Sequence, residues 1–440
     1  MNTFRHLPLS LTLAAAFALP AHAQSLVDLY ESARSFDANY QSARAQFEAN
    51  LYKAEQAKAG LLPSAGLALG VNRVNIDSNN ATAESTYGNH GATLSASQPL
   101  YRPANQATAE QGKRQVLLAQ AQLTAAEQDL IVRVSQAYFD VLAASDSLTF
   151  VQAQKSAVSE QLASAKRNFE VGTATITDTR EAQARYDLTL AQEIAVQNDL
   201  RVKKIVLDQL TGKSESTPKP LAVPVVIAEI NPNDVNSWVA LTEEASPGIQ
   251  QARLGLEVAE LETQKAQAGN KPTLDLNASY AMTQNNGIAS NAAADYRTNV
   301  TSIGLSFNLP LFAGYAIQNR VKETQSLQDK ARNDLEGARR SVALATRSAF
   351  FGVQSGLGQV KALEAAETSS QVALDATKLG YQVGVRVNVD VLNAQTTLFD
   401  TKAKLAKARY DVLLGGLKLR QASGTLKVDD LNAVNALLLK

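Results

Sequence analysis

The chain contains one sequence pattern twice. Matching positions keep an offset of 209 to 212 residues over most of the 440 residues: Gly60 with Gly269, Pro63 with Pro272, Pro99 with Pro310, Asp178 with Asp390, and Gly212 with Gly424. So constant an offset indicates that one unit was duplicated and fused. We therefore expect two structural repeats at 24–212 and 233–424, a proline-containing linker at 213–232, and a short C-terminal tail at 425–440.

Residue types that support catalysis or metal binding are scarce. The chain has no Cys, which excludes disulfides, a thiolate nucleophile and a Cys-based zinc site, and it has only three His. No Gly-rich phosphate loop or nucleophile–base pattern is visible. Lys plus Arg equals Asp plus Glu, so no charge excess favours nucleic acid. We expect no catalytic, cofactor-binding or metal site.

The first residues have the pattern of a secretory signal peptide. Arg5 precedes an apolar stretch at 7–19, and Ala21-His22-Ala23 is a small-residue cleavage site. This assigns 1–23 to a signal peptide and predicts export. No later apolar run reaches the roughly 18 residues that a membrane helix needs.

Each repeat has the same expected order of elements. A helix is expected at Ser25–Ala59 and again at Asp234–Ala268. Apolar and polar residues then alternate at 67–72, 94–97, 274–282 and 303–309, which predicts four strands with one apolar face. The polar stretches 75–90 and 284–299 between the strands are expected to be long loops.

A very long helix follows each strand pair, at Ala104–Asn168 and Ala316–Gly380. Apolar residues spaced by three and then four predict coiled-coil packing, and such a helix is about 100 Å long. Gly172 and Gly384 are expected to form left-handed turns at the tips. Return helices are expected from Asp178 and Asp390, with Asp178 and Glu181 forming a capping-box pattern.

Four amphipathic strands cannot close a membrane barrel, because the smallest have about eight strands. Open sheet edges in lipid are costly, since each unpaired backbone group costs several kcal/mol. If the strands lie in a membrane, copies of the chain must therefore pair with one another. From the residues alone we expect an oligomeric barrel with long helical hairpins, a mainly α chain with a membrane β part.

The chain resembles the TolC family of outer-membrane efflux and type I secretion channels over essentially its whole mature length. The most specific stretch runs from Tyr381-Gln382-Val383-Gly384 to Leu398, and its partner is Phe169-Glu170-Val171-Gly172 to Asp178. The resemblance implies a homotrimer, a shared twelve-stranded barrel in the outer membrane and a periplasmic α-helical tunnel. It also implies that the duct works with an inner-membrane pump through a periplasmic adaptor.

The same resemblance implies a gate at the hairpin tips. The matching positions are Thr177, Asp178, Tyr381 and Arg386, where an acid and a hydroxyl could accept from a phenol and a guanidinium. It also implies rings of acid at the constriction, which Asp390 fits and Asn393 does not, because the best-known members have a second acid there. Asp178 and Asp390 have helix capping as an alternative role, and Arg386 could be a solvated tip residue.

Two other classes of function remain open on the sequence. A periplasmic adaptor also has long helical hairpins, although it normally carries one hairpin, compact β domains and an anchor, which the duplicated strand pairs disfavour. An enzyme is disfavoured by the absence of a recognisable catalytic pattern. The cargo, drugs or secreted proteins, is not specified by the sequence.

Overall fold

The computed structural model describes residues 23–76, 85–222, 224–225, 227–286 and 295–439. The predicted signal peptide therefore lies outside the described residues, apart from Ala23. The elements in chain order are α1 (Leu26–Phe36), α2 (Ala38–Ala59), β1 (Ser64–Ile76), β2 (Ser85–Tyr101), α3 (Pro103–Glu170), α4 (Ile176–Thr211), α5 (Val235–Ala245), α6 (Pro247–Ala268), β3 (Thr273–Asn286), β4 (Tyr296–Asn308), α7 (Ala316–Gln382), α8 (Asn388–Ala422) and α9 (Val428–Asn435). Among these described residues, no helix is both long and apolar enough to cross a membrane.

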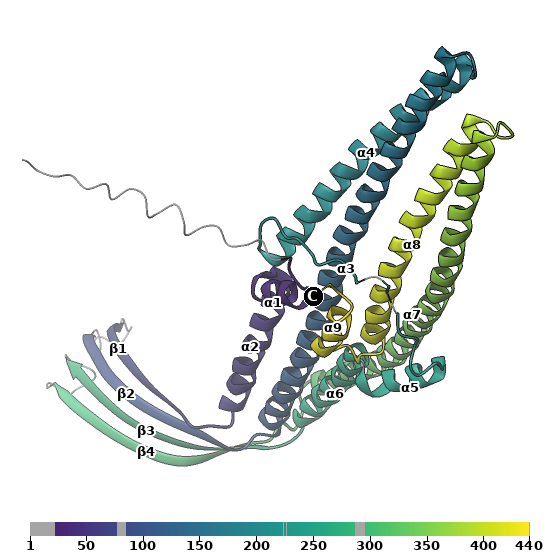
Figure 1. Ribbon diagram of the computed structural model, residues 1–440. Helices are drawn as coiled ribbons and strands as arrows, with labels where there is room; N and C mark the ends of the chain where they lie inside the picture. Colours follow the sequence, from purple (N-terminus) through teal and green to yellow (C-terminus); the bar gives the residue numbers. More distant parts are fainter. Residues whose placement is uncertain (1–22, 77–84, 223, 226, 287–294, 440) are drawn as a thin grey trace, which may run out of the picture. The chain divides into compact units, whose positions relative to one another are not determined.

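The chain divides into two compact units, and the long helices α3 and α7 each contribute to both. Unit 1 contains the residues up to Ser42, the segment Ala125–Ser246 and the residues from Val342 onward. Unit 2 contains Ala43–Thr124 and Pro247–Ser341. Two helical hairpins, α3 with α4 and α7 with α8, make up most of unit 1 (Figure 1).

Apolar side chains on facing helices hold each hairpin of unit 1 together. In the first hairpin the buried cluster contains Val158, Leu162, Ala165 and Ala182. Around the second hairpin, a larger cluster is formed by Trp238, Phe350, Val353, Val360, Leu405, Ala408, Val412 and Leu419. The expected coiled-coil packing is therefore seen in both hairpins, and the first cluster also includes Leu392 of α8.

The predicted linker and tail pack against unit 1 rather than extending away from it. In the 213–232 segment, Leu221 forms a β-bridge with Leu438, and the carbonyl of Lys219 accepts a 2.8 Å hydrogen bond from the Tyr138 hydroxyl. The tail forms α9, whose Leu431 is fully buried. Both segments thus add to the core of unit 1.

The two helices expected at 25–59 and 234–268 are each broken in two, so those predictions are wrong in this respect. The first break is at Asp37, whose carboxylate accepts from the Tyr40 backbone N–H at 2.8 Å and receives a bidentate pair from Arg133 at 2.9 and 3.0 Å. The second break is at Ser246, followed by Pro247 at the start of α6, where proline is well tolerated. At Asp37 the helical sequence pattern continues through the break and could not reveal it, whereas Ser246-Pro247 is a helix-boundary signal that the prediction overlooked.

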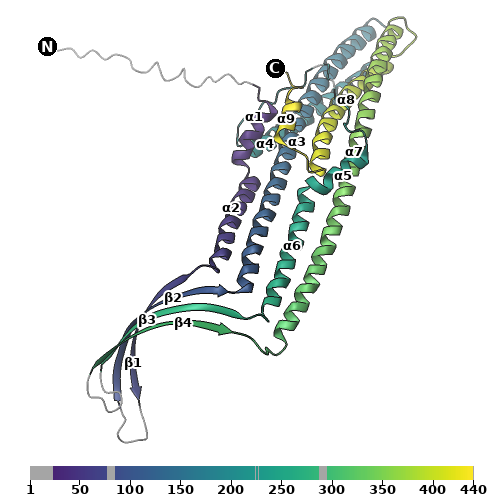
Figure 2. The same cartoon turned by 90° about the horizontal axis from the view of Figure 1, so that it is seen from below.

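Unit 2 contains a four-stranded antiparallel sheet in the order β1-β2-β3-β4. The register places Leu67 opposite Leu94 and Leu94 opposite Tyr280, so the apolar residues of neighbouring strands share one face. The other face carries Ser, Gly, Thr and Asn, and a hollow of about 490 Å³ on it is lined largely by residues of these types. The sheet is curved (Figure 2), and its hollow side is the polar one.

In the loops expected at 75–90 and 284–299, the described residues are nearly all strand. The β1–β2 ladder continues to the pair Ile76 and Ser85, and the β2–β3 ladder continues to Gly88 and Asn286. Polar residues here alternate with other polar or small residues, so no hydrophobic period marks them, yet backbone pairing still forms. Only 77–84 and 287–294 fall outside the described residues.

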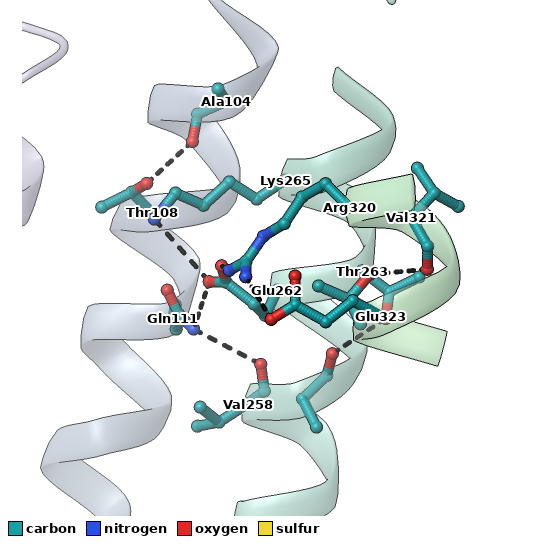
Figure 3. A network of polar contacts seen from close by, with 12 residues as sticks. Ala104, Thr108, Gln111, Val258, Glu262, Thr263, Lys265, Arg320, Val321 and Glu323 are labelled. Atoms are coloured by element: carbon teal, nitrogen blue, oxygen red, sulfur yellow. Dashed lines mark hydrogen bonds and ion pairs between the residues drawn. The ribbon is translucent and has the colours of Figure 1, made fainter. Parts of the chain in front are cut away.

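A polar network links three helices of unit 2 close to the ends of their strands (Figure 3). The Glu262 carboxylate on α6 accepts from Arg320 of α7 at 2.6 Å and from Gln111 of α3 at 3.2 Å. Burial raises the pKa of Glu262, but the hydrogen bonds from Arg320 and Gln111 outweigh it and hold the pKa below its usual range. The Glu262 carboxylate thereby joins α3, α6 and α7, the helices next to β2, β3 and β4 in the chain.

We predict that Asp37→Ala destabilises the first turn of α2. It removes the cap of Tyr40 and leaves Arg133 without this partner, a loss of about 1–3 kcal/mol, so amide exchange around residues 38–41 should speed up about tenfold to a hundredfold. The Arg133 hydrogen bonds lower the pKa of Asp37. The stabilisation is therefore complete at pH values above about 4, the pKa of Asp37 in the unfolded chain. It is lost as the pH falls through the lower pKa that Asp37 has in the folded chain.

Hydrogen–deuterium exchange measures this change. The matched control is Glu48→Ala, which breaks an exposed ion pair with Arg44 on the same helix and should change exchange little. Equal exchange at 38–41 in Asp37→Ala and wild type would contradict the role given to Asp37.

Candidate functional site at the hairpin tips

Each hairpin tip is closed by a glycine in the left-handed region. Gly172 has φ of 76° and Gly384 has φ of 81°. The chain reverses just before each return helix, where the backbone N–H of Thr173 donates to Asn168 at 2.8 Å and that of Val385 donates to Gly380 at 2.9 Å. Both predicted tip turns therefore occupy the positions and conformation that the sequence indicated.

The two return helices begin with different caps. In α4, Thr175 is the N-cap, and the Asp178 carboxylate accepts from the Thr175 N–H at 2.9 Å and from its hydroxyl at 2.7 Å. The capping box is thus Thr175 with Asp178, which corrects the predicted pairing of Asp178 with Glu181. In α8, Asp390 accepts from the Val387 N–H at 3.4 Å, and Val387 has no side-chain group to reciprocate.

The structure places the four predicted gate residues at the tips but does not join them to one another within one chain. The Tyr381 phenol accepts a 3.2 Å hydrogen bond from the Asn168 amide of the first hairpin. Arg386 pairs with Asp390 on its own tip at 3.7 Å. Thr177 is exposed. Of the four, Tyr381 alone makes a side-chain bond between hairpins here, with a partner that the sequence analysis did not select.

A further contact between the hairpins is made by the first turns of α8. The Asn388 side chain is 1% exposed; it accepts from Gln161 of α3 and donates to the backbone carbonyl of Asp178 in α4 at 3.2 Å. One turn later Leu392, also 1% exposed, packs into the apolar cluster of the first hairpin. These residues were missed by sequence reasoning.

Asn393 also lies in this region. Its amide oxygen accepts a 2.8 Å hydrogen bond from Arg185 of α4, so the residue expected at the second ring position is bound to a cation of the first hairpin. A usable sequence signal existed, because Asn388, Leu392 and Gln395 are spaced by four and three and therefore share one helix face. All three are buried.

A second link between the hairpins lies farther from the tips. The Tyr410 hydroxyl of α8 donates a 2.6 Å hydrogen bond to the Asp146 carboxylate of α3. Burial raises the pKa of Asp146, and the bond from Tyr410 opposes this only in part. The Tyr410 ring also stacks on Phe139, with centroids 5.7 Å apart. Gln154 donates to Thr396 at 3.4 Å and Lys418 donates to Gln136 at 3.1 Å, so polar groups join the two hairpins of unit 1 at several levels.

Metal ligands do not gather at this site. Within the described ranges, no group of three or more His, Asp or Glu side chains could hold a metal ion. The side chains at the tips are amides, hydroxyls, carboxylates and guanidiniums, which form reversible hydrogen bonds. In this arrangement the two hairpins are hydrogen-bonded to each other.

Comparison with known proteins identifies the class. The family described as outer membrane efflux protein matches residues 29–213 and 238–425. The chain is 33% identical over 444 residues to the outer membrane protein TolC of Escherichia coli, covering 99% of this chain and 89% of that protein. It is 29% identical over 424 residues to the alkaline protease secretion protein AprF of Pseudomonas aeruginosa, covering 94% and 88%.

The fold also agrees with a solved structure. The outer membrane protein VceC of Vibrio cholerae superposes with a TM-score of 0.78 at 19% identity, covering 91% of this chain and 96% of that one. The chain therefore belongs to the outer membrane efflux protein family. It is an outer-membrane channel protein, and the family is not a class of enzymes.

We predict that Gly384→Ala destabilises the second tip turn by about 1–2 kcal/mol, because a Cβ disfavours the left-handed conformation. Amide exchange at residues 383–387 should speed up accordingly. Gly358→Ala is the matched control: a Cβ there meets nothing within 4 Å, and in a helix interior it should stabilise slightly. Slower or unchanged exchange at the tip in Gly384→Ala would show that the turn tolerates a side chain.

Proposed function

We propose that three copies of this chain form an outer-membrane exit duct that opens and closes at the hairpin tips. The observation that carries the proposal is the pair of open edges on the sheet. Among the described strands, β1 and β4 each pair on one side only. In lipid those edges must be satisfied by another strand, and a second copy of the chain offers the complementary edge.

Three is the smallest number of copies that would leave an open lumen in the proposed barrel. Two copies supply eight strands, and a barrel of about eight strands is filled by its own side chains. Three copies supply twelve, which leaves room for an aqueous path. The two strand pairs of each chain, one from each duplicated repeat, would then alternate around the barrel.

The two faces of the sheet support this orientation. On the apolar face, Leu69, Val71 and Ile303 are 75%, 85% and 76% exposed in the single chain, as lipid-facing residues would be. The polar face is the hollow one, as the wall of a water-filled lumen would be. Membrane-facing and water-facing residues thus alternate along every strand.

The helical hairpins of the repeats at 24–212 and 233–424 would provide the periplasmic part. We propose that the tips of the six hairpins in a trimer meet around the axis and close the duct at rest. Thr177, Asp178, Tyr381 and Arg386 would hold this closure, some of them across chain boundaries, and Asp390 would form an acidic ring. A periplasmic adaptor and an inner-membrane pump are the proposed partners.

The cargo is proposed to include small molecules, secreted proteins or both. The relatives carry names for both activities, efflux and protease secretion. Deleting the gene and scoring drug sensitivity together with the secreted proteome tests the proposal. Increased sensitivity or loss of secreted proteins, restored by the intact gene, supports it; no change in either contradicts it.

We predict that Tyr381→Phe with Arg386→Ser opens the duct. The double change removes the Asn168–Tyr381 bond and the Arg386–Asp390 pair. A hydrogen bond contributes about 0.5–1.5 kcal/mol, an exposed pair less, and a trimer contains three copies of each. Single-channel conductance in planar bilayers should rise several-fold.

The matched control is Tyr186→Phe with Arg180→Ser on α4, which should leave conductance unchanged. Asp390→Asn tests the acidic ring by comparison with Arg386→Ser, because both changes break the Arg386–Asp390 pair but only Asp390→Asn removes the carboxylate charge, while keeping an acceptor for Val387. It should weaken block by a multivalent cation added on the periplasmic side. Unchanged conductance in the Tyr381/Arg386 variant, with normal assembly, would place the closure elsewhere.

A further inference from the structure

We propose that the lipid-facing side of the sheet binds a phosphorylated lipid headgroup at the strand ends that lie away from the helices. The residues that bind it are Arg73 of β1, His90 of β2 and Arg297 of β4, and we call them the basic band. The proposal rests on the proposed function, because the barrel gives the sheet its lipid-facing side and a second copy to pair with.

The register of β1 and β2 puts Arg73 and His90 on the apolar face of the sheet. Residues that lie opposite each other share a face, and successive residues of one strand alternate between faces. His90 lies opposite Val71 and comes four residues before Leu94, so it shares their face. Arg73 follows Val71 by two residues and shares that face as well. Both Arg73 and His90 are exposed.

The ladders carry the same face across the sheet to Arg297. His90 lies opposite Gln284, and Gln284 lies opposite Arg297. The Arg297 guanidinium donates to the Met282 sulfur at 2.7 Å and to the Asn299 side chain at 3.3 Å. Met282 and Asn299 lie opposite each other one step along the same face, so the guanidinium is held on the apolar side.

The basic band lies at the height expected for lipid headgroups. Phe307 and Arg297 are both on the apolar face of β4, and 307 − 297 gives a separation of ten residues. At about 3.3 Å per residue and a strand tilt of about 45°, they are about 23 Å apart across the membrane. The apolar band of such barrels is about 25 Å tall. With Phe307 near its periplasmic edge, Arg297 lies near its outer edge.

Acidic groups do not neutralise the basic band from within the strands. Among the described residues of β1 to β4, the one Asp or Glu is Asp275. It lies on the polar face and accepts from Arg102 at 2.7 and 2.8 Å. The acids Asp77, Glu84 and Asp295 belong to the connections between strands. Phosphate groups would therefore supply the negative charge that this face lacks.

The polar face carries no charge at the same height. The neighbouring row of paired residues on that face is Asn72, Asn89, Asn285 and Tyr296. If the cations served to steer cargo, they would be expected on this face, which would line the lumen. Their place on the opposite face points to a ligand in the membrane.

A second copy of the chain would complete each site. Arg73 is on β1 and Arg297 is on β4, the two strands with an open edge. Pairing between copies would put these arginines on neighbouring strands, whose backbones are about 4.8 Å apart. A guanidinium binds phosphate through two parallel hydrogen bonds, so two of them from different chains suit a headgroup with two phosphate groups.

Native mass spectrometry of the purified full-length oligomer tests this inference. The probes are diphosphoryl lipid A, the neutral lipid phosphatidylcholine, and inorganic pyrophosphate as a soluble source of the same groups. We expect one lipid A molecule per chain to remain bound, and weaker binding of the other two probes. Arg73→Gln with Arg297→Gln should weaken lipid A binding about tenfold or more, because hydrogen bonds to charged groups are lost.

The matched control is Lys322→Gln with Arg332→Gln on α7. It removes the same charge from exposed residues outside the sheet and should leave lipid A binding unchanged. The single variants Arg73→Gln and Arg297→Gln should each weaken binding severalfold, and they take the place of the double variant should it fail to assemble.

Three results would overturn the inference. The first is an assembled double variant, or a pair of single variants, that binds lipid A like wild type. The second is equal binding of phosphatidylcholine, which would mean apolar contact alone. The third is equal binding of pyrophosphate, which would mean a site for soluble anions. The proposed function fails separately, if wild-type protein is a monomer in the same spectra or gives no channels in planar bilayers.

Discussion

Among the described strands, β1 and β4 each leave one backbone edge without a partner strand, and these open edges are the constraint on which the rest of the molecule depends. A four-stranded sheet with one apolar face is not stable alone in water, because the apolar face would be exposed to solvent. It is not stable alone in lipid either, because the backbone groups at its edges would be unpaired. The proposed pairing between copies would resolve both problems. The antiparallel β2–β3 pairing joins the two strand pairs of one chain. Each chain would therefore contribute one continuous four-stranded section to the wall of the proposed barrel.

In the helical part, contacts within a hairpin and contacts between hairpins have different roles. Apolar clusters hold the two helices of each hairpin together. Contacts between the hairpins combine apolar packing of Leu392 and of the Tyr410 ring with hydrogen bonds: Tyr410 with Asp146, Arg185 with Asn393, and the bridge through Asn388. Apolar cores make the hairpins stiff, and hydrogen bonds between them contribute modest energies that can be broken and re-formed. In the proposed gate, such contacts would let the hairpins separate without unfolding.

Local sequence patterns predicted those parts of the fold that depend on neighbouring residues. The strand alternation around Leu67, the long coiled-coil helices and the tip glycines Gly172 and Gly384 follow from residue spacing or backbone conformation. The break at Asp37 does not, because Arg133, its partner, lies 96 residues away. Likewise Asn388 is separated from Gln161 by 227 residues, so its role requires knowing which helix faces meet. The polar ends of the strands lack a hydrophobic period and were therefore assigned to loops.

The most direct test of this account is chemical cross-linking of the two sheet edges. Because the chain has no cysteine, the introduced thiols would be the only ones available to the cross-linker. Asn72→Cys on β1 and Thr298→Cys on β4 place thiols on the polar face of each edge strand. A short bismaleimide applied to the purified double variant should produce species of two and three chain masses on a denaturing gel, and nothing larger. Either single variant should remain at one chain mass. A double variant that stays at one chain mass, while both thiols react with a monofunctional maleimide, would contradict pairing between copies.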